Sequence, residues 1–224
     1  SSVKVGQRPG SAGKTGPGGF IPSYRVAEEV VVTGVHGKHR IEGIGACMAY
    51  RRDLWHQLGG FDEALGAGAP LRSAEEVDFT VRALAEGCSV MESPHVHVIH
   101  HGYRPWHAQD DRRGGHLFGI GVTAAKHLRR SSPAYLYVLA RLAWRWAFGR
   151  PVVDFGRRPA RLPRMRAFVQ GLRAGARQPV DDYGRLTGST PMQNGASARQ
   201  APKPARITTP HEPFPNFFLI GAAK

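Results

Sequence analysis

The chain has 224 residues, a formal net charge of +14 and a hydrophobic content of 41%. A chain of this length can bury a substantial core in one or two domains. It contains no run of about 18 or more apolar residues, which excludes a membrane-spanning helix. Cys47 and Cys88 lack the paired spacing of a zinc site or a disulfide framework, so buried thiols in a reducing compartment, the cytoplasm, are expected.

The charge is distributed unevenly along the chain. Residues 1–111 carry a net charge of −2, residues 112–185 carry +13 and residues 186–224 carry +3. The high isoelectric point therefore belongs to one segment. An argument from the whole-chain charge to a nucleic-acid partner would mislead.

The first half of the chain predicts short strands and helices in alternation. Residues 1–19 are rich in Gly, Ser and Lys and predict a loop, and a start at Ser1 without Met or a signal peptide suggests a piece of a longer protein. Residues 29–35 and 43–50 predict strands, and residues 51–58 predict a helix that Gly59 and Gly60 end. Residues 88–99 predict a strand broken at Pro94. This order favours an α/β architecture.

The segment LRSAEEVDFTVRAL, residues 71–84, predicts a helix that Gly87 terminates. Its local pattern fits a capping box, in which Ser73 and Glu76 bond to each other's backbone amides. The segment also concentrates three carboxylates in an otherwise basic chain, from Glu75, Glu76 and Asp78. Two interpretations stay open: a solvated helix start, or a site that requires negative charge.

The basic segment predicts helices. Residues 116–148 turn helical, and in residues 134–148 an apolar run is interrupted by Arg141 and Arg145 on one face. Residues 164–177 place Met165, Phe168 and Leu172 on one side, with Arg elsewhere. These helices either pack on the preceding domain or lie on a membrane surface. Residues 184–213 are polar and rich in Pro, which predicts a disordered linker.

The order of motifs resembles the C-terminal half of the catalytic domain of family-2 glycosyltransferases, which have the GT-A fold. A small apolar segment (residues 45–48) precedes a helix, a Gly-Gly-Phe-Asp-Glu turn (residues 59–63), an acidic pair that opens a helix, and a His on the following strand. The resemblance covers residues 28–180 approximately. It implies sugar transfer from a nucleotide sugar to a glycan or a lipid-linked acceptor.

The resemblance also assigns roles to single residues. An inverting transfer needs a carboxylate that accepts the proton of the acceptor hydroxyl. The family places this base at the second residue of the acidic pair, here Glu76 where Asp is usual, with Glu75 as the alternative. The remaining assignments are acceptor binding for Gly59, Gly60, Phe61, Asp62 and Asp78, donor binding for Gly45 and Ala46, and metal or diphosphate contact for His100.

The donor's leaving group is a nucleoside diphosphate, whose charge Mg²⁺ or Mn²⁺ normally offsets. The family's Asp-x-Asp metal motif belongs to the N-terminal half, and this chain has none before residue 43. We therefore expect residues 1–111 to be a partial catalytic domain that is inactive alone. Residues 112–183 are expected to form a basic helical extension.

Residues 214–224 suggest a second resemblance. PNFFLIGAAK is similar to the first strand and phosphate loop of a PAPS-dependent sulfotransferase, which would make Lys224 the lysine that binds the cofactor PAPS. The alternative is a tail strand of the first domain. A rival to the enzymatic interpretation is a basic module on residues 112–185 that binds an anionic membrane surface, on the inner face of the plasma membrane, or nucleic acid. Nucleic acid is disfavoured, because no known nucleic-acid motif is present.

Overall fold

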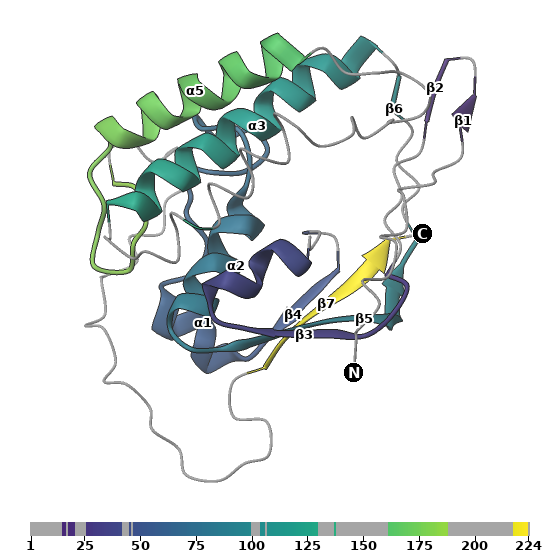
Figure 1. The fold of residues 1–224 in the computed structure, drawn as a ribbon, viewed down its shortest axis with the longest axis vertical. Helices are drawn as coiled ribbons and strands as arrows, with labels where there is room; N and C mark the ends of the chain where they lie inside the picture. Colours follow the sequence, from purple (N-terminus) through teal and green to yellow (C-terminus); the bar gives the residue numbers. More distant parts are fainter. Residues whose placement is uncertain are drawn as a thin grey trace, which may run out of the picture.

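The computed structural model describes residues 15–16, 18–20, 26–41, 45, 47–99, 104–105, 107–129, 137, 161–187 and 217–223. Within these ranges the chain is a mixture of helices and strands, in agreement with the α/β class predicted from the sequence. Figure 1 shows a sheet at one end and two long helices side by side at the other.

The main sheet has four strands in the order β3–β5–β7–β4. Their bounds are Val30–Thr33 for β3, Ser89–Val98 for β5, Phe217–Ala223 for β7 and Met48–Tyr50 for β4. β7 runs parallel to β5, whereas β3 pairs with β5 and β4 pairs with β7 in antiparallel fashion. A smaller antiparallel sheet joins β1 (Thr15–Gly16), β2 (Gly19–Phe20) and β6 (Arg104–Pro105).

The helices lie between and above these strands. Their bounds are Val35–Arg40 for the 3-10 helix η1, Arg52–Leu58 for α1, Glu75–Ala85 for α2, His107–Leu128 for α3 and Arg161–Arg177 for α5. α2 lies between the sheet and the pair formed by α3 and α5 (Figure 1). None of the helices in the described ranges is long and apolar enough to cross a membrane.

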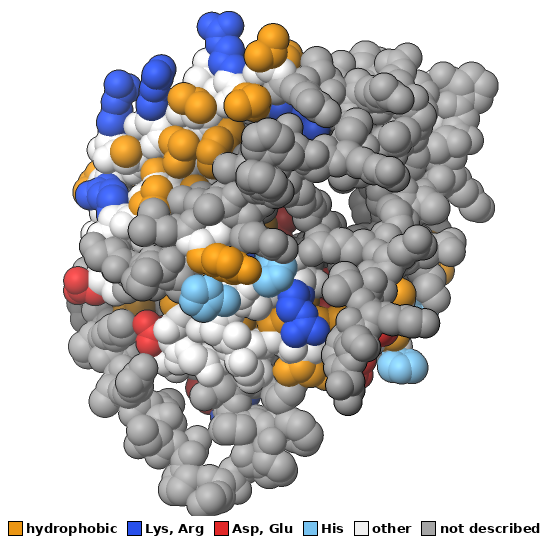
Figure 2. Space-filling view, viewed as in Figure 1, with side chains coloured by type: hydrophobic (Ala, Val, Ile, Leu, Met, Phe, Trp, Pro, Cys, Tyr) orange, Lys and Arg blue, Asp and Glu red, His pale blue; other side chains and the backbone are white. Residues whose placement is uncertain are grey.

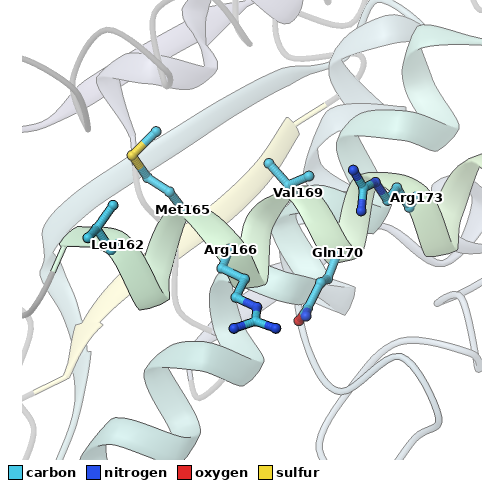
Figure 3. A pocket seen from close by; sticks show the side chains of 6 residues that line it. All are labelled: Leu162, Met165, Arg166, Val169, Gln170 and Arg173. Carbon is cyan, nitrogen blue, oxygen red and sulfur yellow. The ribbon is translucent and has the colours of Figure 1, made fainter.

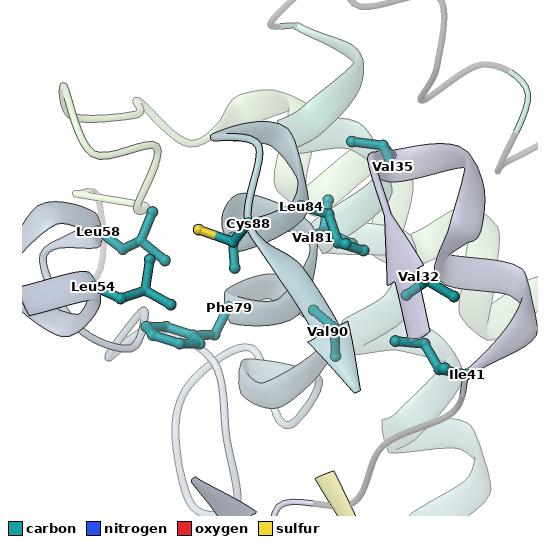
Figure 4. Packing of buried hydrophobic residues seen from close by; sticks show 11 residues of the cluster. Val32, Val35, Ile41, Leu54, Leu58, Phe79, Val81, Leu84, Cys88 and Val90 are labelled. Atoms are coloured by element: carbon teal, nitrogen blue, oxygen red, sulfur yellow. The ribbon is translucent and has the colours of Figure 1, made fainter. Parts of the chain in front are cut away.

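One hydrophobic core joins α1, α2 and the sheet (Figure 4). Its buried members come from β3, η1, α1, α2 and β5 and from residues next to them: Val32, Val35, Ile41, Leu54, Leu58, Phe79, Val81, Ala83, Leu84, Cys88 and Val90. Beside Phe79, aromatic rings fill the space between α1 and β4. Tyr50 stacks on Trp55 with ring centroids 5.2 Å apart, and Phe61 meets Trp55 edge-on at 5.2 Å. These contacts make Phe61 a packing residue that holds the turn after α1 to the core.

Both short helices end at the glycines that the sequence predicts. In α1 the amide of Gly59 donates to His56 and the amide of Gly60 donates to Trp55. In α2 the amide of Gly87 donates to Leu84 while that of the following residue donates to Ala83. Both pairs form the Schellman pattern, which needs a left-handed residue. Gly59 and Gly87 supply it with φ of 70° and 84°.

The predicted strand 88–99 is confirmed as β5. Its pairing with β7 shifts register between Ser93 and His97, at the place where Pro94 predicts a break. A proline cannot donate a ladder hydrogen bond, so an irregularity at this position is expected. The first half of β5 is mostly buried and the second half mostly exposed, so only the first half belongs to the core.

The two long helices touch through glycines. A Cβ atom built on Gly171 of α5 would lie 2.0 Å from the carbonyl oxygen of Phe118, and one built on Gly175 would lie 2.6 Å from that of Val122. On α3, a Cβ on Gly121 would lie 2.3 Å from the carbonyl oxygen of Phe168. Only glycine permits backbones to approach this closely. The helix predicted at 164–177 is therefore confirmed, and glycines set its face toward α3. Met165, predicted on the same side as Phe168 and Leu172, is instead 49% exposed.

Strand β7 occupies an interior position of the main sheet. Leu219 pairs with Met91 of β5 on one side and with Ala49 of β4 on the other. This is the alternative in which residues 214–224 form a tail strand of the first domain, and it does not favour a separate domain starting there. Of the predicted linker 184–213, the structure describes residues 184–187, where Leu186 bridges Val180. Residues 188–213 and Lys224 lie outside the described residues.

Candidate functional site

The turn after α1 and the middle of α2 meet α3 in a buried network of charged side chains. Lys126 Nζ lies 2.6 Å from Asp62 Oδ2 and 2.6 Å from Asp78 Oδ1. Arg82 Nε donates to Asp78 Oδ2 over 2.9 Å, and His127 Nε2 lies 2.9 Å from Asp78 Oδ1. All five side chains are almost completely buried. Two carboxylates face an ammonium and a guanidinium, so the buried charges are compensated.

The network sets the protonation of its members. Burial alone would raise the pKa of Asp78, but Lys126 and Arg82 hold it well below its usual range. Burial lowers the pKa of His127, because the imidazolium would lose its hydration there. Asp78 is therefore a permanent anion and His127 is neutral near pH 7. Neither group is poised to exchange a proton with a substrate.

The same network fixes the backbone of the Gly-Gly turn. Arg82 donates its two terminal nitrogens to the carbonyl oxygens of Leu58 and Gly60. Arg185 donates to the carbonyl oxygen of Gly59. These charge-assisted bonds join the end of α1 to α2 and to the segment that follows α5.

Asp62 completes the turn. Its Oδ1 accepts the amide of Ala64 over 3.1 Å, and its Oδ2 accepts the amide of Leu186 over 2.9 Å. Both oxygens of Asp62 and of Asp78 thus bind groups of the protein itself. This placement favours a structural role for the two carboxylates over the acceptor contact predicted for them.

The acidic pair opens α2 next to this network. Glu75 and Glu76 are the first two residues of the helix and are half-buried. A Cβ on Gly66 would lie 3.5 Å from the carboxyl carbon of Glu75, and one on Gly45 would lie 4.0 Å from Cβ of Glu76. The two glutamates therefore border different segments, Glu75 the loop 62–74 and Glu76 the predicted donor-side segment around the exposed Gly45.

The predicted capping box is wrong. Ala74 occupies the N-cap position with φ of 78°, and no side chain caps the helix. The hydroxyl of Ser73 instead donates to the carbonyl oxygen of Gly115 on α3, over 3.1 Å. The close approach requires Gly119, because a Cβ there would lie 2.2 Å from the carbonyl oxygen of Ser73. Packing against α3 has replaced the local cap, so the Glu76 carboxylate has no capping task.

Glu75 differs electrostatically from the buried aspartates. Burial raises the pKa of Glu75, and the neighbouring carboxylate of Glu76 raises it further, although His116 on α3 acts in the opposite direction. A raised pKa brings a carboxylate closer to the range in which it exchanges protons near neutral pH. The acidic pair, and not Asp62 or Asp78, is therefore the candidate for acid–base chemistry.

The other predicted site residues fall into two groups. Gly59, Gly60 and Phe61 shape the turn through their backbone and packing, and a Cβ on Gly59 would collide with the Tyr183 ring at 2.7 Å. Ala46, His100 and Lys224 lie outside the described residues. Among the residues that the structure describes, no group of three or more His, Cys, Asp or Glu side chains could hold a metal ion.

Sequence reasoning missed the partners of the two aspartates in the network, Arg82, Lys126 and His127, and it missed Arg185, which binds the Gly-Gly turn. One signal for Lys126 was present, because it is the single Lys among sixteen basic residues in 112–185. A Lys ammonium is a compact donor that can bridge two carboxylates at once. Comparison of the chain with protein-family models, with curated proteins and with solved structures gives no match.

Proposed function

We propose that the chain carries the acceptor-side half of an inverting glycosyltransferase of the GT-A fold. It would transfer a sugar from a nucleotide-sugar donor to a glycan or lipid-linked acceptor. The observation that carries the proposal is the half-buried acidic pair at the start of α2, in which the pKa of Glu75 is raised by burial and by its neighbour. The resemblance of the surrounding motifs supplies the reaction class.

The buried network supports this proposal by what it holds together. Asp62 belongs to the Gly-Gly-Phe-Asp-Glu turn and Asp78 to the acidic helix, and Lys126 binds both carboxylates at 2.6 Å. The two motifs on which the resemblance rests are thus neighbours in space. The network fixes the helix whose first turn presents Glu75 and Glu76, which is the arrangement that a positioned proton acceptor requires.

In the proposed reaction the acceptor hydroxyl attacks the anomeric carbon of the donor sugar. A C–O bond forms to the acceptor as the bond to the nucleoside diphosphate breaks, and the hydroxyl proton passes to a carboxylate. Glu76 accepts this proton, as the resemblance assigns. Glu75 adds negative charge beside it, which favours proton acceptance by the pair as a unit.

The nucleotide-sugar donor and a divalent cation such as Mg²⁺ or Mn²⁺ belong to the proposed reaction. The cation would offset the charge of the departing diphosphate. The described residues do not form a cation site, so no step is assigned to a metal held by them. Of the two residues predicted to bind the donor, the structure describes Gly45, which borders Glu76.

The test replaces Glu76 by Gln in the chromosomal gene, so that the natural protein is examined. Surface glycans and lipid-linked sugars of the cells are then compared by mass spectrometry. A carboxylate base contributes about 10²–10⁴-fold to such a reaction, so one sugar-containing species should disappear or fall by at least tenfold.

A matched control is Glu63→Gln, which removes an exposed carboxylate from the neighbouring turn. Immunoblots should show equal protein levels for both variants. If Glu76→Gln and Glu75→Gln both leave the glycan profile unchanged at normal protein levels, the acidic pair has no catalytic role and the proposal fails.

A further inference from the structure

Helix α5 has one face committed to the protein and one face without a described neighbour. Gly171 and Gly175 lie against the backbone of α3, as their blocked Cβ positions show. On the opposite side three apolar side chains are exposed: Leu162 at 80%, Met165 at 49% and Val169 at 40%. Large apolar side chains gathered on one face of a helix mark an interaction surface.

The three apolar residues form a stripe. They are separated by three and four positions, so they line one side of the helix. Arg166, Gln170 and Arg173 border the stripe on the same helix. Figure 3 shows Leu162, Met165 and Val169 on one side of α5 and Arg166 and Gln170 on the other.

The charge of this face selects the partner. α5 contains five Arg and no Asp or Glu. Figure 2 shows basic side chains beside the hydrophobic ones along this part of the molecule. A helix with apolar residues in a stripe and arginines along it fits the interface of an anionic bilayer, where the arginines meet lipid phosphates and the apolar residues enter the acyl region.

The surface does not suit a second copy of the chain equally well. A symmetric contact between two α5 faces would bring Arg166 and Arg173 of both copies together, and like charges in contact oppose association. Double-stranded nucleic acid would use the arginines but would leave the apolar stripe without a partner. An anionic bilayer satisfies both halves of the face.

We propose that α5 docks this face on an anionic membrane surface. Leu162, Met165 and Val169 enter the boundary between headgroups and acyl chains, and Arg166 and Arg173 bind phosphate groups. Because the glycines of α5 pack closely against α3, docking of α5 also holds α3 at the membrane. This inference is independent of the proposed sugar transfer and stands or fails separately from it.

The experiment is flotation of the full chain with vesicles. Vesicles of equal parts phosphatidylcholine and phosphatidylglycerol should carry the protein upward at 150 mM salt, and vesicles of phosphatidylcholine alone should carry at least about tenfold less. The double variant Leu162→Gln/Val169→Gln tests the apolar stripe, and Arg166→Gln/Arg173→Gln tests the charges. Each should lower the bound fraction on anionic vesicles about tenfold or more.

Matched controls remove similar groups elsewhere. Val96→Gln alters an exposed valine on β5, and Arg40→Gln/Arg52→Gln removes two exposed arginines from η1 and α1. Circular dichroism and thermal unfolding establish that all variants keep the fold. The controls should bind anionic vesicles like the unmodified chain.

Four outcomes would overturn the proposal. Failure to float with anionic vesicles excludes the membrane as partner. Equal flotation of α5 variants and controls assigns binding to another surface. A shift in sedimentation, seen without vesicles and abolished by the α5 variants, assigns the face to a second copy. DNA binding that depends on Arg166 and Arg173 but not on Leu162 and Val169, without vesicle binding, assigns it to nucleic acid.

Discussion

Glu75 at the start of helix α2 and Asp78 in its middle have pKa values that are shifted in opposite directions. Asp78 is fully buried among Lys126, Arg82 and His127, and its pKa is held far below the usual range. Glu75, less than one turn earlier, is half-buried beside another carboxylate, and its pKa is raised. Burial pushes both pKa values upward, so the difference comes from the neighbours.

Within one short motif, this contrast distinguishes a carboxylate that stabilises the fold from carboxylates that are candidates for proton transfer. The sequence places Glu75, Glu76 and Asp78 together, and nothing local distinguishes them. The fold brings two cations to the third residue, whereas it leaves the first two beside a loop and the segment around Gly45. A carboxylate that is locked in ion pairs stabilises the fold, and one that lacks such locking keeps the ability to exchange protons.

The largest expected effect comes from removing the locked carboxylate. Asp78→Asn leaves Lys126 and Arg82 with one acidic partner fewer in a buried site. We expect the free energy of unfolding to fall by about 3–5 kcal/mol, because unpaired buried charge is costly. Urea denaturation followed by circular dichroism measures this loss.

The control for Asp78→Asn is Asp53→Asn. Asp53 pairs with Arg51 over 2.7 Å, but both side chains are more than a third exposed. Exposed pairs contribute about 0–1 kcal/mol, so this variant should change stability little. Equal effects of the two substitutions would contradict the assignment of Asp78 to the stabilising network.

A smaller expected effect is loss of stability in acid, in two stages. The pKa of His127 is lowered on folding, so the unfolded chain binds the extra proton first and stability falls as pH drops below about 6.5. The pKa of Asp78 is also lowered, so its contribution is present above its unfolded value and is lost below about pH 4. Unfolding free energies measured from pH 7 to pH 3 would reveal both stages.

The variants assign each stage. His127→Gln should remove most of the decline between pH 6.5 and pH 5 and leave the decline below pH 4. Asp78→Asn should remove most of the decline below pH 4 and leave the decline between pH 6.5 and pH 5. If the unfolding free energy of the unmodified chain stays constant from pH 7 to pH 3, neither His127 nor Asp78 makes the protein sensitive to acid.

The smallest expected effect has the opposite sign. Because the pKa of Glu75 is raised in the folded state, folding retains its proton more strongly, and stability is lost as pH rises through the folded pKa. Glu75→Gln should therefore increase stability at pH 7, by less than about 1 kcal/mol because solvent screens a half-exposed charge. Denaturation at pH 7 and at pH 4 measures it, and a gain that is equal at both pH values would show that ionisation of Glu75 is not its cause.

The local features of the fold could be predicted from the sequence. The helix ends at Gly59 and Gly87 follow from the need for a left-handed residue, and strand β3 follows from its run of β-branched residues. The helix predicted at 164–177 follows from its periodicity, and it is observed at Arg161–Arg177. Each of these features is decided by neighbours within a few positions, so pattern reasoning captures it.

The features that pattern reasoning missed depend on distant residues. The capping box failed because Ser73 bonds to Gly115, which is far along the chain on α3. Lys126 joins Asp62 and Asp78 across a similar separation, and no local spacing reveals such a contact. The acidic pair itself could be found in the sequence from its order among other motifs. That Asp78 has a structural role different from the pair could be seen only from its neighbours in three dimensions.

The position of β7 has a consequence for how the molecule assembles during synthesis. β5 and β4 emerge from the ribosome long before residues 217–223, yet Leu219 must insert between Met91 and Ala49 to complete the sheet. Until then the facing edges of β4 and β5 expose unpaired backbone groups, which invite pairing with other chains. Non-local pairing of this kind also slows folding. The nascent chain is therefore prone to aggregate until β7 has been synthesised and has paired with β4 and β5.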